Sequence, residues 1–523
     1  MSRPRPAARA ILALALAALP LVPAGCGGDR PAAPATATRG RYDGSGRLVE
    51  GVRQTTTLPN VVLVVLDTVR RDAIEPTPDG PPALARLAAR ARRFTEFVDA
   101  TSAASWTAPS VTTTLTGLLP SDHGVQGRME ASPLVPAVAT LAEMLAAVGY
   151  QTVALTAGGW VSREMGLGQG FERFEEHWAM SDPRKLLRRT LDGLDRARPL
   201  FLLLHTYDAH DPYGRKDPPE GHDDPAAVAR VNEEVARYAE RIVRDETILG
   251  EDGRRLLLGW RADPLFAQAL GARVGRDRAG SAVVTYQWMG HLGSDRRRET
   301  EDTLRARYRH GLELLDANLD TVLDVLDRAE LPGSTATIVV SDHGEAFGEH
   351  DALGHGRWLH DVLTRVLLLV RAPSRMSAGR VRGSCGLVDV VPTVLSMCGL
   401  PVPEASPGRS LIPLAAGREA GVPVLAEDFR RQRLADGTMY TVRLVTVRTE
   451  AAKVLITWDP RDGSVTEVRF DLAADPGELD PKPVGDLATL GADFADAVTR
   501  ARAHVATFHR RGDSEGEGRF SER

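Results

Sequence analysis

The chain of 523 residues exceeds the length of one typical hydrophobic core, which predicts a large domain with a smaller one attached. Its formal net charge of −5 at pH 7 excludes the basic surface field that nucleic-acid binding requires. The chain has only four lysines, so its cationic contacts must come almost entirely from arginine.

The N-terminus has the features of a secretory signal peptide. Residues 1–25 combine an arginine-rich start with the apolar run Ala10–Leu19, which is too short to predict a transmembrane helix. Cys26 follows Ala-Gly and resembles the lipidated cysteine of a bacterial lipoprotein, and a simple secreted protein is the alternative. We therefore expect an exported protein in the periplasm or at the cell surface, anchored to a bacterial membrane. Residues 26–58, rich in Gly, Pro, Ala and Thr, predict a flexible tether.

Two apolar, β-branched runs end abruptly in a carboxylate. Asn60–Leu66 leads directly to Asp67, and Thr335–Val340 leads through one serine to Asp342 and His343. Such runs predict buried parallel strands, and ligands of open α/β sheets bind where the carboxyl ends of these strands meet. We therefore expect the two carboxylates and the imidazole to lie close together.

The segment from Ser105 to His123 supplies a candidate nucleophile. Thr107 is followed by Ala108, Pro109 and Ser110, so its hydroxyl precedes a proline-stiffened start of a helix. The positive end of a helix dipole favours an alkoxide at this point. The alternative is that Thr107 acts only as an ordinary helix cap.

Helical and strand patterns alternate along most of the chain. Helices are predicted at 81–93, 138–148, 186–194 and 308–326. The last three are followed by predicted strands at 151–155, 199–205 and 335–340, respectively. This alternation predicts an α/β fold with a doubly wound, mostly parallel sheet and helices on both faces.

The charged, partly helical stretch 214–307 interrupts the alternation. We interpret it as an insertion near the active-site edge that shapes substrate choice, because loops at that edge carry such roles. A solvated helical excursion without a catalytic part is the alternative.

The C-terminal part has a different pattern. A helix and loop at 386–403 precede strand-like segments and a closing helix, which predict a small antiparallel α+β subdomain over residues 401–510. These segments are 423–427, 439–448, 452–458 and 465–472, and the helix is 492–508. The polar tail 511–523 predicts disorder. Cys385 and Cys398 either form a disulfide or remain buried thiols.

Four segments, in this order, resemble the sulfatase family within the alkaline-phosphatase-like superfamily. They are LDTVRRD at 66–72, TAPS at 107–110 continuing into TLTGLLPSDHGV, HTYDAHDPY at 205–213, and SDHGEAFGEHDALGHG at 341–356. The resemblance runs from about residue 59 to about residue 480. It implies an alkaline-phosphatase-like fold with a catalytic domain over residues 59–400.

The resemblance implies a divalent metal ion, at least one, held by four side chains with Thr107 as a shared ligand. The metal ligands are Asp67, Thr107, Asp342 and His343. Manganese, zinc or calcium would serve, and the mixed oxygen and nitrogen donors suit manganese or zinc better than calcium.

Two further histidines have family counterparts that act on the substrate. His355 falls where relatives contact the transferred group or the leaving oxygen, and a surface-loop residue is the alternative. His210 resembles a histidine that faces the substrate, and a turn-stabilising role is the alternative. Asp208 belongs to the same segment, whereas His205 ends a strand as an ordinary polar group would, so we leave it out of the site.

The sequence departs from the usual sulfatase pattern at the nucleophile. Family sulfatases oxidise a Cys or Ser to formylglycine within C/S-x-P-S-R, but Thr107 cannot become that aldehyde and Val111 replaces the arginine. Thr68 replaces the second aspartate of the usual pair, and AGGWVS at 157–162 lacks the expected lysine. No formylglycine is therefore expected. Threonine nucleophiles do occur in the superfamily's phosphodiesterases and in its phosphoethanolamine and phosphoglycerol transferases.

The sequence therefore predicts an exported, metal-dependent hydrolase or transferase that acts on phosphate or sulfate esters through Thr107, with phosphoesters favoured. The substrate would be a small molecule or a glycan or lipid-headgroup ester. A true sulfatase is one alternative, and a catalytically inactive surface binder of an anionic glycan or lipid headgroup is another.

Overall fold

The computed structural model describes residues 58–78, 80–127, 132–176, 183–210, 213, 294–329, 331, 333–356, 358–433 and 439–511. The predicted signal peptide, almost all of the tether, residues 214–293 of the predicted insertion and residues 512–523 of the tail lie outside these ranges and remain predictions. Within these ranges, no helix is long and apolar enough to cross a membrane.

An eight-stranded sheet forms the centre of the larger part of the chain. Its strands are β1 (Asn60–Leu66), β2 (Thr95–Phe97), β4 (Gln151–Leu155), β5 (Arg173–Glu175), β6 (Leu200–Thr206), β7 (Thr335–Ser341), β10 (Leu368–Arg371) and β11 (Gly379–Val381). They are ordered β11-β2-β10-β7-β1-β6-β4-β5. The strands from β7 to β5 run parallel, and β10 pairs antiparallel with both of its neighbours.

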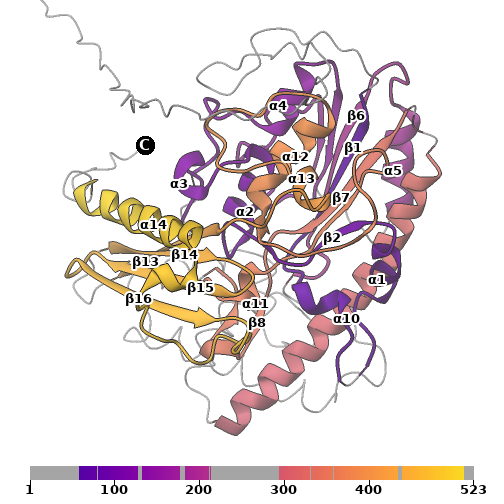
Figure 1. The fold of residues 1–523 in the computed structure, drawn as a ribbon. Helices are drawn as coiled ribbons and strands as arrows, with labels where there is room; N and C mark the ends of the chain where they lie inside the picture. Colours follow the sequence, from indigo (N-terminus) through magenta and orange to yellow (C-terminus); the bar gives the residue numbers. More distant parts are fainter. Residues whose placement is uncertain are drawn as a thin grey trace, which may run out of the picture. The chain divides into compact units, whose positions relative to one another are not determined.

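Helices cover both faces of this sheet (Figure 1). The helices within the described ranges are α1 (Ala85–Ala91), α2 (Thr107–Thr116), α3 (Pro120–His123), α4 (Leu141–Ala146), α5 (Pro183–Asp192), α10 (Ser294–Asp327), α11 (Asp361–Thr364), α12 (Val390–Met397), α13 (Ile412–Ala415) and α14 (Ala492–Arg511). Alternate residues of β1 pack in different cores: Val62 and Val64 with α1, α5 and α10, and Val61 and Leu63 with α2, α4 and α12. The doubly wound, mostly parallel α/β fold is confirmed.

Some helices differ in length from their sequence patterns. Helix α4 begins at Leu141 rather than at residue 138, because Thr140 and Glu143 form a reciprocal capping box. Helix α1 begins at Ala85, after the predicted residue 81, and Asp316 of α10 accepts hydrogen bonds from the amides of Arg86 and Leu87 at 2.8 and 2.9 Å. Because Asp316 caps α1 from 230 positions away in the sequence, no local sequence pattern marks the residue at which this helix begins.

The C-terminal sheet is antiparallel, as predicted, with β13 (Val424–Arg433), β14 (Met439–Arg448), β15 (Ala452–Asp459) and β16 (Ser464–Asp471) in sequential order. Helix α14 covers one face of it (Figure 1), where Phe494 and Val498 pack in one core with Val445 and Val454. Smaller paired strands are β3 (Ala100–Thr101) with β12 (Cys385–Gly386), and β8 (Ala346–Phe347) with β9 (Leu353–Gly354). Single 3-10 turns lie at Arg71–Ile74, Glu349–Asp351, Leu387–Asp389 and Leu487–Leu490.

The two cysteines left open by the sequence are unpaired. Cys385 and Cys398 are both free and buried. The sulfur of Cys398 lies 3.2 Å from the hydroxyl of Tyr150. Of the two alternatives, the buried thiols are therefore the ones observed.

A buried ion network joins α11 to the C-terminal sheet. Asp361 accepts hydrogen bonds from Arg448 at 2.8 Å and from Lys453 at 3.0 Å, and Lys453 also lies 2.8 Å from Glu478. The Lys453 side chain is only 1% exposed, so its charge depends on these two carboxylates.

We expect Asp361→Asn to lower the free energy of unfolding by about 3–5 kcal/mol, because it removes a charge that compensates two buried cations. Denaturant unfolding at neutral pH measures this loss. The matched control is Asp480→Asn, which breaks an exposed pair with Lys482 and should change the stability by about 0.5 kcal/mol or less. Equal effects of the two substitutions would contradict the prediction.

Candidate active site

Two carboxylates meet at the carboxyl edge of the central sheet. Because β1 and β7 are parallel neighbours with Leu66 opposite Ser341, the next residues, Asp67 and Asp342, emerge side by side. Both side chains are fully buried. One ligand atom from each, together with one from His343, lies within 4.8 Å of the others. The structure thus brings the three predicted ligands together.

Thr107 completes this group from the other side. It is the first residue of α2, its hydroxyl donates a hydrogen bond to Oδ2 of Asp67 at 2.9 Å, and Nε2 of His343 lies 3.4 Å away. Every residue of α2 is buried, so packing on all sides fixes the position of the hydroxyl. The hydroxyl therefore lies at the positive end of a helix and against a carboxylate.

The orientation of His343 suits a metal ligand. Its Nδ1 lies 2.9 Å from the carbonyl oxygen of Gly344, which can only accept a hydrogen bond. Nδ1 therefore carries the proton, and Nε2 presents its lone pair toward Thr107 and the carboxylates.

The two carboxylates fit a cation. Oδ1 of Asp67 and Oδ2 of Asp342 are buried and have no hydrogen-bond partner within the described part of the chain. Burial, and then the charge of Asp67, raises the pKa of Asp342 well above its usual range. Burial would also raise the pKa of Asp67, but the nearby histidines outweigh it and lower that pKa to about 2. A cation between the two carboxylates would keep both of them ionised, so these residues fit a divalent metal ion.

A strained turn holds the carboxylates in place. Thr68 has a φ of 58°, which is unusual for a β-branched residue and costs roughly 1–3 kcal/mol. Its amide donates to Asp342 at 3.1 Å, and its hydroxyl donates to the carbonyl of Asp67 at 2.7 Å. The hydroxyl of Tyr308 in α10 donates to the carbonyl of Thr68 at 2.7 Å. No local sequence pattern predicts this role of Tyr308, because the residue lies 240 positions from its partner.

The two predicted substrate-facing histidines lie beside this group. His355 is buried, and its ring centroid lies 4.5 Å from that of His343 and 5.1 Å from that of His210. Nδ1 of His355 lies 3.0 Å from the fully buried carboxylate of Glu345. No sequence pattern marks Glu345 as a site residue, although it follows His343 by two residues. The amide of His210 donates to the carbonyl of Tyr207 at 2.9 Å, so the residue also forms part of a turn.

His205 also lies at the site, although the sequence predicts only an ordinary polar strand end at this position. Its side chain is fully buried, and its Nε2 lies 3.7 Å from Oδ2 of Asp67. This distance is too long for a hydrogen bond, so the contact is electrostatic. Asp208, from the same segment, is buried, and its amide donates to the hydroxyl of Thr206 at 3.1 Å.

An aromatic pair lies next to the threonine. Trp106, which directly precedes Thr107, packs edge to face against Trp160 at a centroid distance of 5.3 Å. Trp160 comes from the AGGWVS segment, and 37% of its surface is exposed, whereas Trp106 is buried. The amide of Trp160 donates to the hydroxyl of Tyr207 at 3.1 Å. Trp160 thus offers an exposed aromatic face beside the site.

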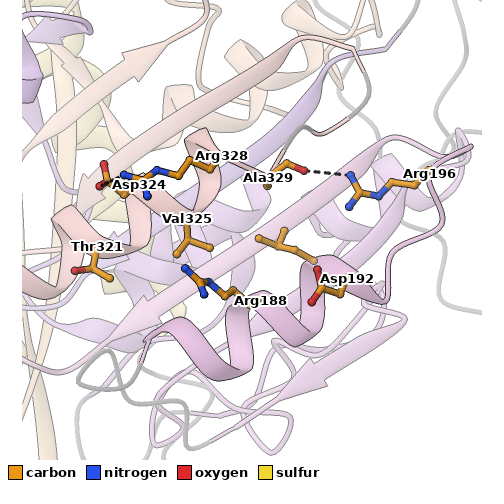
Figure 2. A pocket seen from close by; sticks show the side chains of 9 residues that line it. Arg188, Asp192, Arg196, Thr321, Asp324, Val325, Arg328 and Ala329 are labelled. Carbon is orange, nitrogen blue, oxygen red and sulfur yellow. Dashed lines mark hydrogen bonds and ion pairs between the residues drawn. The ribbon is translucent and has the colours of Figure 1, made fainter.

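A separate pocket of about 410 Å³ lies between α5 and α10 (Figure 2). It is lined by Arg188, Leu191, Asp192, Arg196, Thr321, Asp324, Val325, Arg328 and Ala329. Arg196 precedes β6 and Ala329 precedes β7, so this pocket lies at the amino ends of those strands. The carboxylates of the candidate site lie at the opposite edge of the sheet, so the pocket takes no part in it.

The doubly wound sheet thus carries two carboxylates, an imidazole and a helix-terminal hydroxyl at the carboxyl ends of its strands, where open α/β proteins bind their ligands. The family model described as sulfatase matches residues 59–400, which is more than half of the chain. The chain therefore belongs to the sulfatase family.

Curated relatives match over shorter stretches. The chain is 30% identical over 201 residues to the choline-sulfatase of Rhizobium meliloti, covering 36% of each chain. It is 28% identical over 184 residues to human arylsulfatase K, covering 34% of this chain and 33% of the relative. The chain thus spans about a third of the length of these relatives.

Solved structures match over most of the chain. The phosphonate monoester hydrolase of Agrobacterium radiobacter has a TM-score of 0.60 and 20% identity, covering 86% of this chain and 96% of that protein. A 2-O GAG sulfatase has a TM-score of 0.58 and 16% identity, covering 88% and 93%. At these identities the likeness shows the fold alone, and the neighbours include both sulfatases and phosphonate monoester hydrolases.

Proposed function

We propose that this protein is an exported, metal-dependent hydrolase or transferase that acts on phosphate esters through Thr107. One observation carries the proposal: the Thr107 hydroxyl, at the start of α2, lies 2.9 Å from Asp67 and 3.4 Å from His343. A nucleophilic hydroxyl needs such a setting, because a free threonine hydroxyl is a weak nucleophile.

Four side chains would hold the metal ion, namely Asp67, Thr107, Asp342 and His343. A divalent ion at this point supplies positive charge that lowers the pKa of a bound hydroxyl and polarises an ester oxygen. The donor set admits manganese, zinc or calcium, and its mixture of oxygen and nitrogen favours manganese or zinc.

The first chemical step forms a bond between Oγ1 of Thr107 and the phosphorus atom, while the bond from phosphorus to the leaving oxygen breaks. Oδ2 of Asp67 accepts the hydroxyl proton over the 2.9 Å hydrogen bond. His355 begins this step doubly protonated, with its Nδ1 donating to Glu345 at 3.0 Å, and its Nε2 gives a proton to the leaving oxygen, which leaves His355 neutral.

The second step releases the phosphoryl group. Water, or a second alcohol, gives its proton to His355 and bonds to phosphorus, while the bond to Thr107 breaks and the threonine regains its proton from Asp67. His210, whose ring centroid lies 5.1 Å from that of His355, assists at the leaving oxygen or at the incoming one. Over both steps, one phosphate ester and one acceptor, water or an alcohol, are converted into the released alcohol and the phosphorylated acceptor, and Thr107, Asp67 and His355 return to their starting states.

Phosphate is favoured over sulfate because of the nucleophile. Thr107 cannot be oxidised to the formylglycine that family sulfatases use, and the segment at 157–162 carries Trp160 and no lysine. A true sulfatase is the second candidate, and the sulfatase relatives favour it. An inactive surface binder of anionic glycan or lipid headgroups is the third. It is disfavoured because a binding site has no need of a hydroxyl held against a carboxylate.

The N-terminal segment supports the proposal that the protein is exported. Its support is the arginine-rich start, the apolar run and the Ala-Gly-Cys sequence ending at Cys26, which together fit a lipid-anchored protein of the bacterial surface or periplasm.

Turnover of aryl phosphate, aryl phosphodiester and aryl sulfate esters by the metal-loaded protein tests the proposal. We expect a phosphate ester to be the best substrate, and we expect acid-quenched protein to carry about 80 Da of added mass at Thr107 as the covalent intermediate. Accurate mass distinguishes a phosphoryl adduct from a sulfuryl one. Preferred turnover of the sulfate ester would support the sulfatase instead, and a metal-loaded protein inert on all three would support the binder.

A further inference from the structure

A second group of metal-ligand side chains lies outside the candidate active site. His350, His360 and Glu478 each offer one ligand atom within 4.8 Å of the other two. They come from the β8–β9 hairpin, from the start of α11 and from the segment after β16. We propose that these three residues bind a zinc ion that is distinct from the metal at Asp67.

One of the ligand nitrogens lacks a hydrogen-bond partner in the described part of the chain. Oε2 of Glu478 lies 3.4 Å from Nδ1 of His360, and this contact is not a hydrogen bond. Nδ1 of His360 is buried without a hydrogen-bond partner in the described ranges, whereas Oε1 of Glu478 is paired with the ammonium of Lys453. The side chain of Glu478 is 1% exposed. Burial of polar atoms without hydrogen bonds is costly, and a bound cation removes that cost.

The surroundings keep the carboxylate ionised and oriented. Nζ of Lys453 lies 2.8 Å from Oε1 of Glu478, and the amide of Asp361 donates to Oε2 at 2.5 Å. Contacts of this kind fix the direction of a ligating carboxylate, as outer partners do in metal sites. Each carboxylate oxygen keeps a second lone pair for the ion.

Residues with a strained backbone lie at the candidate active site and at the proposed zinc site. Four non-glycine residues of the described chain have positive φ: Thr68 at the candidate active site, and His350, Asp351 and Glu478 here. The φ values of His350 and Glu478 are 54° and 56°. Residues with a strained backbone persist where the surrounding structure holds them, and they cluster at functional sites. Two of the four strained residues, His350 and Glu478, are proposed zinc ligands.

Zinc suits this donor set. Two imidazoles and one carboxylate form a common protein set for zinc, with water as the fourth ligand of a tetrahedral site. The rings of His350 and His360 are stacked at a centroid distance of 3.6 Å with an interplanar angle of 6°. Because a metal ion lies in the plane of each ligating ring, one ring must tilt out of the stack when zinc binds. His350 lies on a turn, whereas the ring of His360 also packs edge to face against Phe470 at a centroid distance of 5.8 Å, so the ring of His350 is the one that moves.

The ion would fasten a hairpin that carries a proposed catalytic side chain. Glu345 and His355 flank the paired strands β8 and β9, and His350 lies between those strands at the turn. Zinc at the turn ties it to His360 and to Glu478 of the C-terminal part. This consequence for His355 rests on the proposed function, whereas the zinc site itself does not.

Zinc content of the full chain tests the proposal. After chelation and reloading with zinc, Asp342→Asn removes the active-site ligand, and we expect this variant to keep one tightly bound zinc ion per chain. We expect the double variant Asp342→Asn/His360→Ala to bind zinc at least about 100-fold more weakly at that site. Circular dichroism confirms that both variants are folded, and cobalt substitution reports loss of the tetrahedral absorption independently of any turnover.

The matched control is His504→Ala in the Asp342→Asn background. Nε2 of His504 lies 2.9 Å from Glu427 in the same C-terminal part, and no third ligand joins them in the metal-ligand groups of the described chain. This control should keep the zinc ion. Zinc content that is equal in the His360→Ala and His504→Ala variants, both folded, would overturn the proposal whatever the enzyme activity. The conservative variant His360→Asn gives the same test if alanine prevents folding.

Discussion

Thr107→Ala is expected to lower kcat by about 10⁴-fold or more, because it removes the atom that accepts the transferred group. The loss should leave the metal content unchanged, since Asp67, Asp342 and His343 remain to hold the ion. Steady-state turnover of the best ester, with metal analysis of the same sample, measures both quantities. The covalent mass adduct should disappear with the hydroxyl.

Two controls separate chemistry from packing in this experiment. Thr107→Ser keeps a hydroxyl at the same place and should retain far more activity than alanine does. Thr112→Ala removes a neighbouring buried hydroxyl of α2, one that donates only to the carbonyl of Ala108 at 2.7 Å, and should leave turnover near that of the unmodified protein. If Thr107→Ala keeps more than about a tenth of kcat, threonine is not the nucleophile.

Removal of the metal ion is expected to cost nearly as much. Exhaustive chelation should lower kcat by about 10³-fold or more, because the ion contributes several kcal/mol of charge stabilisation. It should also lower the melting temperature, since two buried carboxylates then face each other without a cation, and a ligand that binds only the native state stabilises it. Turnover and thermal unfolding with and without added manganese, zinc or calcium measure these effects and rank the metals.

Asp342→Asn is the control for the chelation experiment. It removes one of the two buried charges, so the variant should be inactive before chelation. Its melting temperature should respond to chelation much less than that of the unmodified protein, apart from any zinc held at His360. If the chelated protein keeps its full activity and added metal does not change it, the mechanism does not depend on a metal ion.

The parts of the fold that could be predicted are those whose signal is local. The run Asn60–Leu66 is buried on both faces, so its sequence is continuously apolar and its end at Asp67 is sharp. The same reasoning found Asp342 and His343, and the proline after Thr107 marked the start of α2. The metal-ligand group of the candidate site could therefore be assembled from sequence patterns alone.

The parts that escaped prediction depend on distant contacts. Tyr308 holds the strained Thr68 turn across 240 positions, and His360 and Glu478 meet although 118 positions separate them in the sequence. Short strands such as β2 and β11, with three residues each, carry too little pattern to be recognised. The place of His205 in the site also escapes prediction, because a histidine at the end of a strand fits the role of an ordinary polar end group equally well.

The unpaired cysteines make metal counting straightforward. Burial raises the pKa of the Cys385 thiol well above its ordinary range and that of Cys398 to about 11. Both sulfurs therefore stay protonated at neutral pH, and a protonated thiol is a poor ligand. Added zinc or manganese will therefore not be lost to these two sulfurs, and the purified protein can be stored under a non-chelating reductant without breaking any crosslink in the described chain.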